Sequence, residues 1–303
     1  MPARLHPSCL VGANPIVWSN DDFADLAGDV PLDTILREMR KAGFAGSELG
    51  HAYPRTPAAL ADALGRHHLR LVTGWHSTYL ASKPFAGEEK EFRAHLNLLK
   101  TLGARVVIVA ECTRCIHGNR DAALGFGSGD NLSPRLTASE WKKFTSGLKR
   151  LAAIAAREEM RIVYHHHMGT VIQGEADLDR LLAAVPEISL LLDAGHLAFA
   201  GIDPVRVAKR YASRIAHVHL KSVRPQVAER VRREGWSFYR AVANGVFTIA
   251  GDGSVDYPAI FATLAAADYR GWLVVEAEED PVKVPALPKA KKARAYVRTH
   301  AGV

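Results

Sequence analysis

Short apolar runs alternate along the chain with longer segments in which apolar residues recur about once per helical turn. The run ISLLLD at 188–193 has the composition of a strand that is buried on both faces. The segment 32–42 instead spaces Leu32, Ile35, Leu36 and Met39 at helical intervals. The two patterns follow each other in a regular order, which predicts repeated strand–helix units.

Eight such units are predicted. The strands are expected at 9–15, 46–50, 69–75, 104–110, 161–166, 188–193, 214–221 and 272–278. The helices are expected at 32–42, 56–66, 88–102, 138–158, 175–184, 204–211, 257–266 and 287–299. Thr137 and Glu140 have the spacing of a capping box at the start of the fourth long helix.

The unbroken alternation predicts an α/β fold, a single (β/α)8 TIM barrel over residues 1–303. Two loop excursions, at about 111–134 and 222–254, interrupt the pattern without a change of composition that would mark a linker. A doubly wound sheet is the competing fold. It usually carries a glycine-rich fingerprint after the first strand, and the turn GANPIVWSN lacks one.

The net charge of +7 adds little to this interpretation. Lysine and arginine are spread along the helices, with clusters at 224–233 and 289–294, so we expect solvated helix faces and no nucleic-acid partner. No apolar run approaches the roughly 20 residues of a membrane span, and no signal-like segment opens the chain. We therefore expect a cytoplasmic protein without a membrane partner.

The three cysteines do not make a disulfide framework. Cys112 and Cys115 form a C-x-x-C motif, but no second cysteine pair accompanies it, as a zinc site would require. We expect free thiols in a loop.

The chemistry gathers where four predicted strands end. In a barrel the carboxyl ends of strands five to eight are neighbours, so His165, Asp193, His219 and Glu276 should converge at the mouth. Two imidazoles and two carboxylates suit Mn²⁺, Co²⁺, Fe²⁺ or Zn²⁺ better than Mg²⁺. Spacing alone leaves His165 and His167 equal as ligands, because alternate residues of a strand share a face.

Several segments carry a family resemblance: PIVWSNDD, AGFAGSELG, YHHHMGT, LLLDAGH, HVHLK, VFTIAGDG and WLVVEAEEDP. Together they resemble the xylose isomerase-like barrels and, among these, the inosose dehydratases. YHHHMGT and the Asn-Asp-Asp opening are specific to the dehydratase branch. The other motifs mark only the wider superfamily.

The resemblance implies a ligand set of His165, Asp193, His219 and Glu276 that binds Mn²⁺ or Co²⁺, with Zn²⁺ or Fe²⁺ as alternatives. Most of the superfamily has glutamate where His165 stands. The acid–base carboxylate pair of the epimerases is therefore missing, which disfavours simple epimerisation. Ser222 also departs from the pattern, because the dehydratases usually have aspartate there.

The implied activity is that of a carbon–oxygen lyase in inositol catabolism. It dehydrates an inosose (2-keto-myo-inositol), a small polyol ketone, to a trihydroxycyclohexane-dione. The expected catalytic residues are Glu276, His76, His196 and Lys221. The expected substrate-binding residues are Glu48, Trp75 and His167. The resemblance also implies a homo-oligomer.

Other functions stay open at this point. A keto-sugar isomerase or epimerase of the same fold is the main alternative, followed by a DNA-repair endonuclease and a non-catalytic sugar-binding barrel. GDGSVDY is either a phosphate cradle or a turn with Asp256 as a helix cap. Trp18, Trp75 and Trp236 either stack on a sugar ring or pack in the core.

Overall fold

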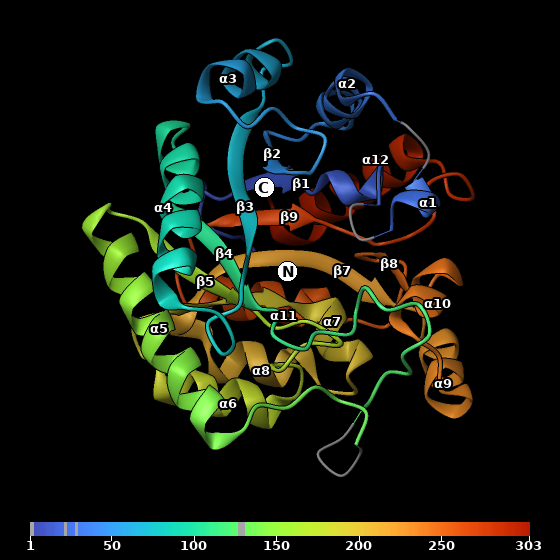
Figure 1. The fold of residues 1–303 in the computed structure, drawn as a ribbon. Coiled ribbons are helices and arrows are strands. Elements are labelled where there is room, and N and C mark those ends of the chain that lie inside the picture. The colour runs from blue at the N-terminus through green and yellow to red at the C-terminus, as the bar shows by residue number, and fades with distance from the viewer. Residues whose placement is uncertain (1–2, 21–22, 28–29, 127–130) are drawn as a thin grey trace.

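The computed structural model describes residues 3–20, 23–27, 30–126 and 131–303, and its strands form a central barrel ringed by helices (Figure 1). The barrel strands are β1 (Leu10–Ala13), β2 (Gly46–Leu49), β3 (Arg70–Thr78), β4 (Val106–Glu111), β5 (Arg161–His165), β6 (Ser189–Asp193), β7 (Ile215–Val223) and β9 (Trp272–Val275). Each is parallel to its neighbours, and the pairs β6–β7, β7–β9 and β9–β1 close the ring. The predicted TIM barrel is thus confirmed.

The outer helices are α2 (Leu32–Ala42), α3 (Pro57–Gly65), α4 (Phe85–Thr101), α5 (Ala138–Arg157), α6 (Glu175–Ala184), α8 (Pro204–Arg210), α11 (Tyr257–Ala266) and α12 (Ala286–Ala301). α5 begins with the expected capping box of Thr137 and Glu140. Asp256 caps α11 by accepting a hydrogen bond from the backbone of Ala259 at 3.1 Å, which confirms the cap interpretation of that turn. Within the described ranges, no helix is both long and apolar enough to cross a membrane.

Most predicted boundaries agree with the structure, but strand three and its helix are longer than expected. β3 runs on to Thr78, and α4 begins at Phe85. The last residues of β3 are mainly polar, and Trp75, His76 and Ser77 are all half-buried, so no alternating pattern marks the end of the strand. After β6 the chain forms a short helix, α7 (Ala194–Phe199), whose cap is Asp193.

The excursion at 222–254 has its own structure. It contains α9 (Pro225–Glu234), α10 (Phe238–Ala243) and β8 (Phe247–Ile249), which pairs antiparallel with the end of β7. The backbone of Leu124, in the other excursion, donates to Trp236 at 3.0 Å and ties the two together. Short elements are also present nearer the N-terminus, η1 (Pro15–Val17) and α1 (Ala24–Ala27).

The hydrophobic core lies mainly between the outer faces of the strands and the helices. The barrel interior contains a much smaller apolar layer around Ile108, Val163 and Leu191. Other residues that point into the barrel are polar and buried, among them Glu48, Asp193 and His219. Because buried polar groups need partners, this part of the barrel is a site rather than a packing core.

Candidate metal centre and substrate cavity

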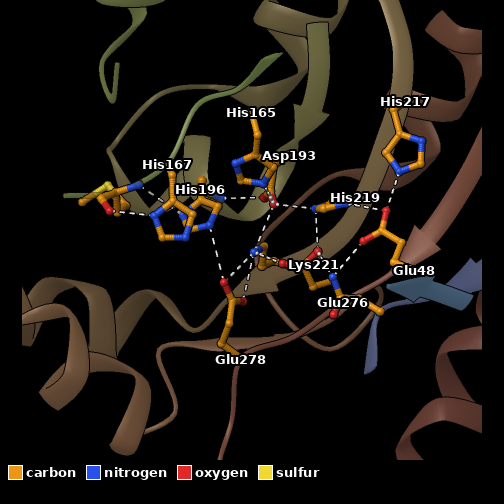
Figure 2. Close-up of polar contacts among 12 residues, drawn as sticks. Glu48, His165, His167, Asp193, His196, His217, His219, Lys221, Glu276 and Glu278 are labelled. Atoms are coloured by element: carbon orange, nitrogen blue, oxygen red, sulfur yellow. Dashed lines mark hydrogen bonds and ion pairs between the residues drawn. The ribbon is translucent and has the colours of Figure 1, made fainter. Parts of the chain in front are cut away.

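The four predicted ligands converge at the mouth of the barrel (Figure 2). Asp193 and His219 are direct neighbours in the register of β6 and β7. Oδ2 of Asp193 lies 3.3 Å from Nε2 of His165 and 3.5 Å from Nδ1 of His219. The same Nδ1 lies 2.5 Å from Oε2 of Glu276, just beyond β9.

This donor set fits a divalent transition metal. The ligand atoms of His165, Asp193 and His219 all lie within 4.8 Å of one another, and the three residues are buried. Oδ2 of Asp193 and Nδ1 of His219 are buried and make no well-aligned hydrogen bond, although charged groups surround both atoms. Two imidazole nitrogens and two carboxylate oxygens are ligands that Mn²⁺, Co²⁺, Fe²⁺ and Zn²⁺ accept.

Glu48, on β2, orients His219. Its Oε1 accepts hydrogen bonds from Nε2 of His219 at 3.1 Å and Nε2 of His217 at 2.7 Å. Its Oε2 accepts from Nδ2 of Asn14 at 2.8 Å. Burial alone would raise the pKa of Glu48, but the interactions with His219 and His217 lower it by more than burial raises it. The pKa of Glu48 therefore lies well below its ordinary value. Glu48 is therefore a carboxylate that leaves Nδ1 of His219 facing the other ligands.

Lys221 is the fixed positive charge of the cluster (Figure 2). Its Nζ lies 3.0 Å from Oδ2 of Asp193, 2.7 Å from Oε1 of Glu276 and 2.8 Å from Oε1 of Glu278. Burial lowers the pKa of Lys221, but these carboxylates raise it well above its ordinary value. The ammonium stays charged and offsets part of the repulsion among the acidic groups.

The stem of Lys221 requires a glycine beside it. A Cβ at position 195 would collide with Cγ of Lys221 and lie 2.9 Å from its Cδ. Because Gly195, in the DAGH segment, has no Cβ, the side chain of Lys221 can pass beside it and place Nζ next to the three carboxylates.

His167 and His196 form a second group with Glu278. Nδ1 of His167 pairs with the carbonyl of Met168 at 2.8 Å, which assigns the proton to Nδ1 and leaves Nε2 as an acceptor. The rings of His167 and His196 are 3.9 Å apart, and Nε2 of His196 lies 3.5 Å from Oε1 of Glu278. Burial lowers the pKa of both histidines well below the ordinary value, so both are neutral.

A cavity of about 330 Å³ opens onto these residues. Its wall brings together most of the predicted site residues: Glu48, Trp75, His165, His167, His219 and Glu276. In the described part of the chain, Asp193, His196 and Lys221 lie behind that wall, fully buried. The volume suits a small polyol better than a polymer.

The structure does not bring His76 to this group. The residues on either side of it, Trp75 and Ser77, line the cavity, so His76 points outward toward α4. Its ring lies 5.4 Å from that of His95 and 5.5 Å from that of Phe92. Burial and the neighbouring His95 lower the pKa of His76 to about 4.

Sequence reasoning gave no role to several groups that take part in the site: Asn14, His51, Arg55, His117 and Glu278 all line the cavity. Glu278 had a usable signal, because it shares the strand-face parity of Glu276. The others come from loops, whose path the hydrophobic pattern does not specify.

Among the three tryptophans only Trp75 lines the cavity, whereas Trp18 and Trp236 are buried and donate to Glu38 and Glu234. Ser222 accepts from the backbone of Val255 at 3.0 Å, away from the cavity wall. The dehydratase-specific Asp21 and Asp22 lie outside the described residues.

Solved structures of other proteins share this fold. D-allulose 3-epimerase from Methylomonas sp., in complex with D-allulose, superposes with a TM-score of 0.66 at 19% identity and covers 99% of this chain and 100% of its own. The IOLI protein with a bound zinc atom gives a TM-score of 0.66 at 15% identity, covering 97% and 98%. At such identities the likeness concerns the fold alone.

The amino-acid sequence shows a closer relationship than the fold does. The model of the xylose isomerase-like TIM barrel family matches residues 30–300. The inosose dehydratase of Geobacillus thermodenitrificans is 43% identical over 295 residues, and that of Clostridium botulinum is 40% identical over 295 residues. Each match covers 97% of both chains. With its barrel and its full-length likeness in agreement, the chain belongs to the inosose dehydratase family of xylose isomerase-like barrels.

Proposed function

We propose that this protein is a metal-dependent hydro-lyase that converts an inosose (2-keto-myo-inositol) into a trihydroxycyclohexane-dione in inositol catabolism. The observation that carries the proposal is the convergence of His165, Asp193, His219 and Glu276 beside a small cavity. Inosose dehydratases at 40% identity and above support the substrate and the reaction. The cytoplasm is the proposed compartment, since all three cysteines are free thiols.

His165, Asp193, His219 and Glu276 would hold the metal. A bound divalent cation would supply Lewis-acid polarisation of the substrate ketone. The mixed nitrogen and oxygen donors favour Mn²⁺ or Co²⁺, and Zn²⁺ or Fe²⁺ also suit them. The IOLI protein, which shares this fold, has a bound zinc atom, and this supports a metal in the present chain.

Substrate binding falls to the cavity wall. Nε2 of His167 accepts a hydrogen bond from a substrate hydroxyl, because its Nδ1 is already paired with Met168. The indole ring of Trp75 lies beside the imidazole of His165, with centroids 5.2 Å apart. It covers an apolar face of the substrate ring. Glu48 lines the same wall, and the hydrogen bonds that it accepts from His217 and His219 give it mainly an orienting role.

Dehydration needs a group that removes the proton next to the ketone. Both oxygens of Glu276 are engaged, one beside His219 and one by Lys221. Glu278 also lines the cavity; both of its oxygens accept from Lys221, and its Oε1 also lies 3.5 Å from Nε2 of His196. We therefore assign proton acceptance to a carboxylate oxygen of Glu278, which keeps spare lone pairs.

Lys221 and His196 act from behind the wall. The ammonium of Lys221 holds Glu276 and Glu278 in place and keeps a positive charge near the developing negative charge. His196 packs on His167 and lies beside Glu278, so it fixes both groups. His76 has no part in the proposed reaction, and the homo-oligomer stays a prediction.

The test is an assay of purified, EDTA-treated protein with scyllo-inosose, with and without Mn²⁺ or Co²⁺, read by mass spectrometry. Metal-dependent loss of one water from the product, abolished in Glu276→Gln, is the expected result. A product of unchanged mass and altered stereochemistry would instead identify an epimerase. No turnover by metal-loaded protein would exclude the inosose as substrate.

A further inference from the structure

The loop after β4 places two cysteines at the ends of one tight turn. The backbone N–H of Cys115 donates to the carbonyl of Cys112 at 3.1 Å, and residues 113–114 form the turn. The first and fourth Cα atoms of such a turn lie within about 7 Å, the range that a disulfide can span. Both thiols are free.

The two thiols have different surroundings. Cys112 is 3% exposed, and its Sγ lies 3.8 Å from the carbonyl of Ala110, whereas Cys115 is only half-buried. Hydrogen bonds from Cys112 and His117 lower the pKa of Cys115, while the contact with Cys115 and burial raise the pKa of Cys112. A thiolate at Cys115 beside a thiol at Cys112 is the arrangement in which one sulfur reacts first and the other resolves it.

The turn is joined to the substrate cavity. The backbone of Ile116 donates to the carbonyl of Gly169 at 2.8 Å, and His117 lines the cavity with its ring 5.1 Å from that of His167. A Cβ at Gly169 would lie 2.9 Å from the backbone nitrogen of His117, so the two loops pack without spare room. We therefore expect a conformational change in the turn to displace His117 in the cavity wall.

Arg114, within the turn, has a strained backbone conformation. Its φ of 59° is in the left-handed region, which is unfavourable for a non-glycine residue. Its guanidinium donates to Glu140 at 3.0 Å and to the carbonyl of Arg135 at 2.9 Å, which anchors the turn on α5.

We propose that Cys112 and Cys115 are an oxidisable pair whose disulfide restrains His117 and lowers the activity of the adjoining site. The oxidant is a peroxide. The thiolate of Cys115 attacks one peroxide oxygen, the O–O bond breaks, and hydroxide leaves, giving a sulfenic acid. The thiol of Cys112 then attacks that sulfur and releases water. Two thiols and one hydrogen peroxide thus give one disulfide and two waters, and a dithiol reductant reverses the change.

The oxidation of Cys112 and Cys115 can be tested without assuming the proposed function. Full-length protein is treated with hydrogen peroxide and examined by intact mass, maleimide labelling and peptide mapping. We expect the loss of two hydrogens, a cross-link between Cys112 and Cys115, and reversal by dithiothreitol. Cys9→Ser is the matched control and should oxidise normally, since Cys9 is buried and bonded to the carbonyl of Tyr269 on another part of the barrel. A stable sulfenic or sulfinic acid without a cross-link overturns the pair.

The coupling to the site rests on the proposed function and is measured by turnover and by hydrogen exchange. In the oxidised wild type we expect kcat/KM for the inosose to fall by about 10- to 100-fold, since displacing a site group by about 1 Å can cost about 100-fold. Cys112→Ser should keep its activity under the same oxidant. Exchange of the Ile116 amide should change on oxidation even if the substrate is another polyol, so a failed inosose assay does not hide the result. An oxidised protein with unchanged exchange at Ile116 contradicts the coupling.

Discussion

Nε2 of His219 donates to Oε1 of Glu48 at 3.1 Å, and Nδ1 on the other side of the ring faces Asp193 and Glu276. The carboxylate thus selects which imidazole nitrogen is offered to a metal. Such partners usually change metal affinity by about 10- to 100-fold when removed.

We therefore expect Glu48→Gln to weaken Mn²⁺ or Co²⁺ binding by about tenfold or more, because the neutral amide holds the tautomer less firmly. Titration calorimetry on metal-stripped protein measures this directly. Glu88→Gln is the matched control: Glu88 is also buried, but it accepts from the backbone of Tyr79 at 2.6 Å, outside the site. Equal metal affinities in the two variants would contradict the orienting role of Glu48.

Gly195→Ala should disturb the site through Lys221. The added methyl group would meet the lysine stem, so Nζ must leave its three carboxylates or the backbone must shift. We expect a loss of about 1–3 kcal/mol in the free energy of unfolding and a lower kcat. Gly65→Ala is the control, since nothing lies within 4 Å of its added Cβ. Urea unfolding and steady-state kinetics compare the two, and a Gly195→Ala protein as active as the control would rule out the steric role.

The convergence of the four proposed ligands could be predicted from the sequence because a barrel gathers the ends of its strands. Asp193, His219 and Glu276 needed only strand order, whereas the choice of His165 over His167 needed the family likeness. The structure shows how the two histidines differ: His165 faces Asp193, whereas His167 is hydrogen-bonded to Met168 and lines the cavity.

Other features could not be predicted because they depend on side-chain direction or loop path. His76 was expected at the site because it follows the third predicted strand, but β3 continues through it and strand alternation sends it to the face opposite Trp75. β8 was missed because a three-residue strand within a loop gives almost no periodic signal. His117 reaches the cavity only because its loop packs on Gly169.

Glu276 and Glu278 should separate in their effects. Glu276→Gln removes a proposed metal ligand, so both metal binding and turnover should fall sharply. Glu278→Gln should keep metal affinity within about threefold and lower kcat by about 100-fold or more, the range of a lost general base. Calorimetry and single-turnover kinetics with metal-saturated protein distinguish the two. Full turnover by Glu278→Gln would return the role of proton acceptor to Glu276.

His76 should make the protein sensitive to acid. Burial and His95 lower the pKa of His76 from 6.5 to about 4, so the folded state prefers the neutral ring and the unfolded state binds the proton more readily. The stability that His76 contributes is therefore complete above about pH 6.5 and is lost as the pH falls towards 4. Its full size is about 3 kcal/mol. His76→Phe keeps a ring against Phe92 and cannot ionise, so its unfolding free energy should fall less between pH 7 and pH 4.5. Urea unfolding at the two pH values measures the difference. Parallel losses in wild type and variant would show that other groups, such as His95, carry the acid sensitivity.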